Sequence, residues 1–436
     1  MHSPEESPGD QRFTASPERY DWPVESFQEE QSFNANRQQI QQFLPYQPWH
    51  RPPLQPWTGF AIAISIGSAA YLLLWTIGRL FGLDHEFLLF TASGMESLPF
   101  LPLALLAYIG ERSYLARLLA SLYWLLLMVF MLLMVWLAVI ETMPGPLAAE
   151  AKSAGPQAVM RSLFRPDSLL IGGLSFFGLG VALLISLAAF TPEIRRVAAR
   201  IIPIDPNSFV HATALATVTC LTLASFVPLM IRQEPPLLLM ASLSRDSQMS
   251  DGAEMRSTVY AFLWLVPATI IAVGYPIRRN FRDALHRVGL VRPRRWQLIL
   301  AVGLVPVLIG LSVAVDNGLG VIWKFFNWPT TDEHAFGELM KFALNPLGAV
   351  IIGVTAGLGE ELSVRGVLQP RLGILLSNLF FTSLHALQYN WDGLLSVFVT
   401  GLALGLIRKY TNTTTSAIVH GGFDFTLIMF DVISNS

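Results

Sequence analysis

The sequence has little charge. Asp, Glu, Lys and Arg make up 14% of its 436 residues, whereas hydrophobic residues make up 53%. A soluble protein carries about a quarter charged residues. The composition therefore excludes an ordinary soluble domain and predicts that the lipid bilayer is a partner of the chain. The net charge of −2 does not indicate a nucleic-acid partner, and we expect none.

Cysteine is almost absent, because Cys220 is the only one and lies inside an apolar segment. A single thiol excludes an intrachain disulfide, so we expect Cys220 to pack against its neighbours. The first residues also lack the basic and apolar pattern of a signal peptide. We therefore expect the first membrane helix to target the chain.

Long apolar runs are abundant, and a run of about 18 or more residues can cross a bilayer. Because lipid offers the backbone no hydrogen-bond partner, the spans must be helical. The expected spans are 58–80, 118–140, 169–190, 209–230, 259–276, 298–315, 347–368, 372–387, 394–407 and 413–432. Residues 86–110, interrupted by Glu96, fit either a kinked span or a half-buried hairpin. The sequence thus predicts an all-α polytopic bundle of about ten to eleven transmembrane helices.

The chain divides into four predicted regions. Residues 1–56 are polar and rich in Pro, Gln, Glu and Ser, which is typical of a disordered tail. Residues 57–277 hold membrane helices with no assigned role. Residues 278–295 contain seven arginines, which predicts a basic cytoplasmic linker. Residues 296–436 hold the last membrane helices and the candidate site.

The orientation follows from counting spans outward from the basic linker. The turns at Arg371 and at 408–409 become cytoplasmic, and the acidic loop 316–341 becomes external. The loop 141–167 also falls outside although it carries lysine and arginine, a mild contradiction. The side of the N-terminal tail depends on whether 86–110 spans.

Two adjacent carboxylates end an apolar run, and ionisable groups at membrane depth indicate function because charge in lipid is costly. Later helices add two histidines and an aspartate at similar depth, roughly 10 to 20 Å below the predicted cytoplasmic surface. The candidate site consists of Glu360, Glu361, Arg365, His385, His420 and Asp424.

The residue types in this set suit hydrolysis. Glu361 with Arg365, and His420 with Asp424, are spaced i,i+4 and share a helix face. A carboxylate and an imidazole in a poorly hydrated pocket can take a proton from water, and a second histidine can support an oxyanion. The same chemistry leaves a second interpretation open, in which zinc binds with an open position for water. Its ligands would be Glu360, His385 and His420.

Three motifs occur in order: Glu-Glu-x-x-x-Arg at 360–365, Phe-x-x-x-His at 381–385 and His-x-x-x-Asp at 420–424. This ordered set resembles the CPBP intramembrane proteases, or Abi family, which include CAAX prenyl endopeptidases and bacteriocin-processing enzymes. The resemblance covers about 345–430, and 281–293 looks like a linker common in bacterial members. It implies a multi-pass cell-membrane endopeptidase, and the orientation predicted from the arginines places the site toward the cytoplasm. The substrate would be a peptide or protein, with or without a lipid.

The resemblance also implies a role for each residue. Glu360 would activate water with His385 assisting, and Arg365 would hold Glu361 in the site. His420 and residue 424 would support the oxyanion.

Position 424 departs from the family pattern. Many members have asparagine there, whose amide can donate a hydrogen bond, whereas an ionised Asp424 can only accept. Asp424 must therefore be protonated, orient His420 or bind a metal.

Two other functions compete with the peptidase. A non-catalytic scaffold or immunity protein would keep the fold but would normally lose a motif residue, and none is missing here. A proton-coupled transporter would use the same residue types as a relay and predicts a repeat between the two halves. The polar residues instead cluster in the last third of the chain.

Overall fold

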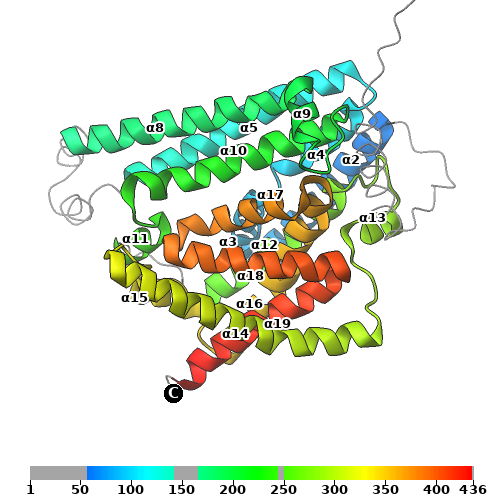
Figure 1. Ribbon diagram of the computed structural model, residues 1–436. Coiled ribbons are helices and arrows are strands. Elements are labelled where there is room, and N and C mark those ends of the chain that lie inside the picture. The colour runs from blue at the N-terminus through cyan, green and yellow to red at the C-terminus, as the bar shows by residue number, and fades with distance from the viewer. Residues whose placement is uncertain (1–55, 142–164, 244–249, 435–436) are drawn as a thin grey trace, which may run out of the picture. The chain divides into compact units, whose positions relative to one another are not determined.

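The computed structural model describes residues 56–141, 165–243 and 250–434. Within these ranges the chain is helical and contains no strand (Figure 1). The predicted all-α membrane bundle is therefore confirmed. The predicted disordered tail falls outside the described residues except for Pro56.

The first half of the bundle contains long helices joined by short ones. The elements are α2 (Pro56–Leu80), α3 (Asp84–Ser93), η1 (Gly94–Glu96), α4 (Phe100–Gly110), α5 (Tyr114–Glu141), α8 (Pro166–Leu187), η2 (Ala188–Phe190), α9 (Pro192–Ala198), α10 (Phe209–Arg232), α11 (Pro236–Leu243) and α12 (Asp251–Ala272). The ambiguous stretch forms η1 and two helices bent by 44° near Glu96. Cys220 is fully buried between helices, as expected for packing.

The second half carries the predicted site. The elements are α13 (Phe281–Val288), α14 (Arg295–Phe326), α15 (Glu333–Leu339), η3 (Lys341–Ala343), α16 (Pro346–Glu360), η4 (Glu361–Leu368), α17 (Gln369–Leu384), η5 (His385–Leu387), α18 (Trp391–Tyr410) and α19 (Thr413–Ser434). Segment η4 is π-helical and continues α16 without a break.

Nine helices in the described ranges are long and apolar enough to cross a membrane, or ten if the bent pair counts as one. Either count is one below the expected ten or eleven spans, because the stretch Pro346–Leu387, where two spans are expected, counts as one helix of 42 residues. Gly373, however, is non-helical inside that stretch, with φ 76° and ψ 174°. The guanidinium of Arg365 lies 4.4 Å from the ring centre of Phe381, so the chain reverses between them. The two spans expected in this stretch are therefore the arms of a hairpin.

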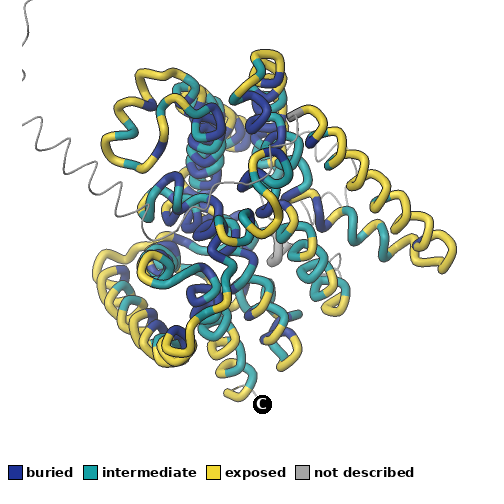
Figure 2. Tube along the Cα trace, turned by 90° about the vertical axis from the view of Figure 1, so that its right-hand side faces the viewer, coloured by how far each residue is buried: buried dark blue, intermediate teal, exposed yellow. Residues whose placement is uncertain are grey.

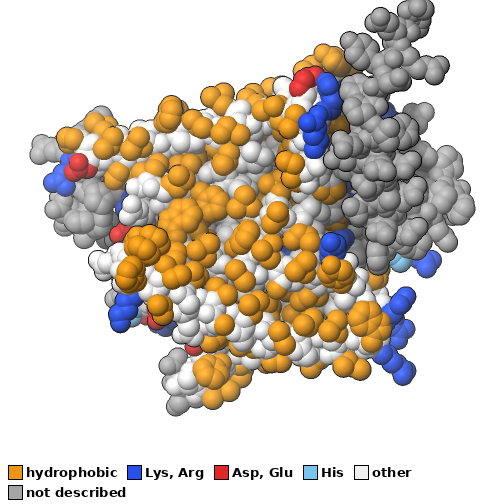
Figure 3. Space-filling model, viewed as in Figure 1, with side chains coloured by type: hydrophobic (Ala, Val, Ile, Leu, Met, Phe, Trp, Pro, Cys, Tyr) orange, Lys and Arg blue, Asp and Glu red, His pale blue; other side chains and the backbone are white. Residues whose placement is uncertain are grey.

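The outer surface is apolar, unlike the surface of a soluble protein. Leu72, Phe177 and Val302 are 57%, 70% and 71% exposed. Figure 2 shows exposed residues along the outer helices and buried ones at the centre, and Figure 3 shows hydrophobic side chains across the visible face. Large exposed apolar surfaces of this kind mark contact with a membrane. The protein is accordingly a membrane protein.

The predicted cytoplasmic segments lie at one end of the helices. In the linker, Arg287 Nη1 donates to the Gly366 carbonyl at 3.2 Å, and the Val288 carbonyl accepts from Thr413 Oγ1 at 2.6 Å. The predicted external loop instead packs on the opposite end of α18, where Thr331 Oγ1 donates to Asp392 Oδ1 at 2.7 Å. This arrangement agrees with the count of spans, and the side facing the cytoplasm stays a prediction.

Helices α16 and α19 approach closely through glycine. A Cβ atom on Gly357 would lie 2.5 Å from the backbone of Gly421, and one on Gly421 would lie 2.2 Å from the Gly353 carbonyl oxygen. Small residues allow such close backbone contact between membrane helices. These glycines therefore set the distance between the two helices that carry the carboxylates and His420.

We expect Gly357→Ala to destabilise the protein by about 1–3 kcal/mol, because the added methyl forces α16 and α19 apart. The measurement is thermal unfolding of the purified protein in detergent. Gly310→Ala on α14 is the matched control, since a Cβ there meets nothing within 4 Å. Equal unfolding temperatures for the two variants would contradict this account of the helix contact.

Candidate active site

Two helix starts place the site residues. Asn345 caps α16, with its Oδ1 accepting from the Gly348 N–H at 2.9 Å, and Pro346 follows at the first helical position. Asn412 acts similarly for α19, where its Oδ1 accepts from the Thr415 N–H at 2.8 Å. Side-chain caps of this kind satisfy otherwise unpaired N–H groups and fix where a helix begins. The caps thereby set the register of the carboxylates against His420.

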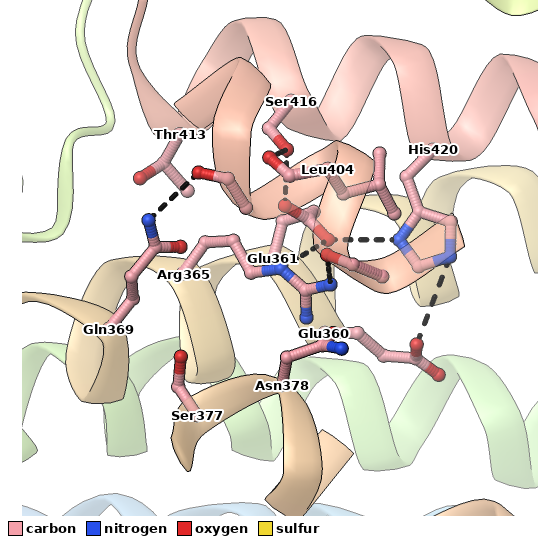
Figure 4. Close-up of polar contacts among 12 residues, drawn as sticks. Glu360, Glu361, Arg365, Gln369, Ser377, Asn378, Leu404, Thr413, Ser416 and His420 are labelled. Atoms are coloured by element: carbon pink, nitrogen blue, oxygen red, sulfur yellow. Dashed lines mark hydrogen bonds and ion pairs between the residues drawn. The ribbon is translucent and has the colours of Figure 1, made fainter. Parts of the chain in front are cut away.

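The carboxylate of Glu361 is the centre of the site (Figure 4). It is fully buried. Ser416 Oγ donates to its Oε2 at 2.5 Å, and His420 Nδ1 lies 3.1 Å from its Oε1. Arg365 Nε lies 3.5 Å from the same Oε1. A buried carboxylate is tolerated when it is paired and hydrogen-bonded in this way, so Glu361 holds the site together.

His420 presents its two ring nitrogens to different carboxylates. Because Nδ1 faces the Glu361 carboxylate, which can only accept, Nδ1 carries a proton and donates. The other nitrogen, Nε2, lies 3.9 Å from Glu360 Oε2 and 3.6 Å from Asp424 Oδ2. In the neutral ring Nε2 is therefore an acceptor that faces both carboxyl groups.

Glu360 differs from its neighbour in exposure. Its side chain is 36% exposed, whereas that of Glu361 is 0% exposed. The distance from Glu360 to His420 exceeds a direct hydrogen bond and is of a size that a bridging water spans. Glu360 and His420 are therefore close enough to contact the same water molecule on the exposed side of the Glu360 carboxylate.

Arg365 ties the carboxylates to α17 and α18. It is 1% exposed, and its Nη2 donates to the Gly401 carbonyl at 2.9 Å. Its guanidinium lies over the ring of Phe381, 4.4 Å from the ring centre. This cation–π contact gives the phenylalanine of the second motif a positioning role that the sequence alone did not show.

His385 does not join the carboxylates in the described part of the chain. Its Nδ1 lies 3.0 Å from the Phe381 carbonyl oxygen, and its ring packs against Phe381 and Tyr389, with centres 4.8 Å and 6.1 Å away. The Phe381 ring centre lies 6.1 Å from that of His420, so the Phe381 ring packs near both histidines. The residue beside Glu360 is thus His420, where the family resemblance had implied His385.

The three ligands of the alternative zinc site are not assembled. Glu360 and His420 approach each other, but His385 packs against two aromatic rings instead. Among the described residues, no group of three or more His, Cys, Asp and Glu side chains is placed to hold a metal ion. The residues as arranged therefore do not fit zinc, and we derive no step through it.

Ser416 is a site residue that the motifs did not reveal. Its hydroxyl donates to Glu361 Oε2 and also lies 3.1 Å from the Leu404 carbonyl oxygen on α18. The available signal was its position four residues before His420, which places both on one face of a helix.

Comparison with known proteins identifies one segment. Residues 342–426 match the family model described as type II CAAX prenyl endopeptidase Rce1-like. The matched segment contains all three motifs, and it confirms the resemblance predicted from them. No curated protein and no solved structure matches the chain. The site therefore lies in a segment related to a family of membrane proteases.

We expect Ser416→Ala to destabilise the protein by about 1–3 kcal/mol, because a buried carboxylate oxygen loses its hydroxyl donor. Thermal unfolding in detergent measures the change. Ser434→Ala is the matched control on the same helix, since the Ser434 hydroxyl is exposed and, among the residues that the structure describes, bonds to backbone carbonyls one turn away. The role assigned to Ser416 is wrong if both variants unfold like the unmodified protein.

Proposed function

We propose that this protein is an intramembrane endopeptidase of the CAAX-protease type. It hydrolyses a peptide bond at or in the membrane with a water molecule that Glu360 activates beside His420. The observation that carries the proposal is the position of His420, held through Nδ1 by Glu361 while Nε2 faces Glu360 and Asp424. The match to a protease family supports the same reaction class.

In the first step Glu360 takes a proton from water, and the water oxygen attacks the carbonyl carbon of the substrate. General-base catalysis of this kind contributes about 10² to 10⁴ in rate. The partial exposure of Glu360 gives water and substrate access, which the fully buried Glu361 lacks. Glu361 therefore orients His420 and does not act as the base.

The second step needs a donor for the oxyanion and a proton for the leaving nitrogen. His420 acts here in its doubly protonated form and keeps both ring protons throughout the reaction. Its Nε2–H donates to the oxyanion, a contact that strengthens as negative charge develops. Asp424 lies on the same side of the ring and holds Nε2 in place. The proton taken up by Glu360 then passes to the amine as the carbon–nitrogen bond breaks.

The substrate is a peptide or protein that reaches the site from the membrane, with a lipidated C-terminus as one form. We place the site toward the cytoplasm, because Gly366 of η4 contacts Arg287 of the basic linker, and arginine-rich loops stay on that side. The location is the cell membrane.

The activity test uses purified full-length protein in lipid nanodiscs and a peptide library that includes prenylated C-terminal peptides, with products identified by mass spectrometry. We expect Glu360→Gln to slow cleavage by about 10² to 10⁴, because glutamine cannot accept the proton. Glu333→Gln, at an exposed carboxylate on α15, should cleave like the unmodified protein. A Glu360→Gln protein with undiminished activity would contradict the assignment of the base. A folded unmodified protein that cleaves no peptide would favour the scaffold function.

The orientation is tested separately by labelling single cysteines in a Cys220→Ser background. His286→Cys lies in the linker and Thr330→Cys in the predicted external loop, and both positions are exposed. We expect an impermeant thiol reagent to label His286→Cys from the cytoplasmic side and Thr330→Cys from the outside. The arginine-based orientation, and with it the cytoplasmic site, is wrong if both label from the same side.

A further inference from the structure

Four arginines gather at the end of the bundle that carries the basic linker. They are half-buried or buried, and they come from four separate segments: Arg279 after α12, Arg287 on α13, Arg371 on α17 and Arg408 on α18. Tyr108 of α4 lies among them and accepts a hydrogen bond from Arg371 Nη2 at 2.6 Å. The cluster thus joins the linker, the N-terminal helices and the helices of the candidate site.

Backbone carbonyls are the main partners of these guanidinium groups. Arg371, which is 5% exposed, donates to the Val367 carbonyl at 2.8 Å and to the Ala272 carbonyl at 3.1 Å. Arg287 donates to the Gly366 carbonyl at 3.2 Å. Arg279 donates to the Val273 carbonyl. These contacts fix the side chains but leave their positive charge unbalanced.

Within the described ranges the cluster contains no carboxylate, although the more distant charge of Glu361 acts on Arg408. None of its arginines has an Asp or Glu oxygen within 4.0 Å there, in contrast to the pair of Arg365 with Glu361. The Nε of Arg408 is buried and has no hydrogen-bond partner in the same part of the chain. An uncompensated buried charge is strongly destabilising, so a bound anion would stabilise the cluster.

The electrostatics of the linker point the same way. Burial lowers the pKa of Arg287 well below its usual value, and the positive charges of Arg371 and Arg279 lower it further. Tyr108 acts in the opposite direction, but no carboxylate is among the main influences. Like charges are therefore held together without a neutralising acid.

We propose that Arg287, Arg371 and Arg408 form a site for a phosphate group, supplied either by inorganic phosphate or by the headgroup of an anionic phospholipid. The planar guanidinium fork matches phosphate oxygens and binds them with charge-assisted hydrogen bonds. Basic pockets between membrane helices on the cytoplasmic side take lipid headgroups in this way. The unpartnered Nε of Arg408 is a donor still available to such a ligand.

Phosphate binding at this site would affect the carboxylates of the candidate active site through one short chain of contacts. Arg287 holds the carbonyl of Gly366, and Gly366 follows Arg365 in the π-helical segment η4. A Cβ on Gly366 would lie 2.7 Å from the Val288 carbonyl oxygen, so the linker packs directly on η4. A bound phosphate that orders Arg287 therefore stabilises the segment that carries Glu361 and Arg365. Binding itself does not depend on the proposed peptidase activity.

The test measures thermal unfolding of the purified full-length protein in detergent during two titrations. One adds inorganic phosphate against chloride at equal ionic strength, since salt alone screens repulsion between arginines. The other adds phosphatidylglycerol against phosphatidylcholine. Because a ligand that binds only the folded state raises stability by mass action, we expect a saturable rise in unfolding temperature. If the unfolding temperature rises only with inorganic phosphate, the ligand is the free anion. If it rises only with phosphatidylglycerol, the ligand is the lipid headgroup. Either result supports the site.

Matched variants separate the site from general electrostatics. We expect Arg287→Gln and Arg408→Gln each to raise the ligand concentration at half-effect by about tenfold, the factor for one lost charge-assisted hydrogen bond. Arg282→Gln removes the same charge from an exposed position on α13 and should leave that concentration unchanged. Having two variants keeps the test decisive if one fails to fold. Equal effects of Arg282→Gln and Arg287→Gln, or no saturable response to either ligand, would overturn the proposal.

Discussion

The pairing of the buried Glu361 carboxylate is the constraint on which the rest of the site depends. A carboxylate at this depth has no water to satisfy it, so each partner must come from the protein. Arg365 comes from the same π-helical segment, whereas Ser416 and His420 come from α19. Since Ser416 also reaches the Leu404 carbonyl and Arg365 the Gly401 carbonyl, α18 is fixed by the same group. The carboxylate thereby sets the relative positions of the elements that build the site.

The two adjacent glutamates have different roles because of helix geometry. Consecutive residues on a helix point about 100° apart, so a pair of acids at the boundary between α16 and η4 cannot share one environment. Glu361 faces the interior and is fully buried, while Glu360 faces the more open side. His420 faces each of them with a different nitrogen, Nδ1 at 3.1 Å from Glu361 and Nε2 at 3.9 Å from Glu360. Burial makes the first acid a fixed anchor, and exposure leaves the second free to exchange protons with water.

The sequence predicted the bundle, most span positions and the meeting of Glu360, Glu361 and His420, because charge in lipid is rare and its spacing is informative. It did not predict the π-helical segment, since the i,i+4 pattern of Glu361 and Arg365 reads as an ordinary helix. It also implied that His385 would assist Glu360. The four-residue spacing between Phe381 and His385 places both on one helix face. It does not fix the direction of the His385 ring, which stacks on Tyr389. Tertiary contacts between helices decide such details.

Two glycine-dependent features bring the three motifs together. Gly373, at φ 76°, reverses the chain midway between Arg365 and Phe381, eight residues from each (373 − 365 and 381 − 373), which stacks the second motif on the first. A residue with a side chain is strained in this left-handed region. The close approach of Gly353 and Gly357 to Gly421 brings α19, and the third motif with it, against α16. The carboxylate of Glu361 can accept from Ser416 and His420 only because backbone approaches this close are possible. Small residues that carry no chemistry therefore determine where the chemical groups meet.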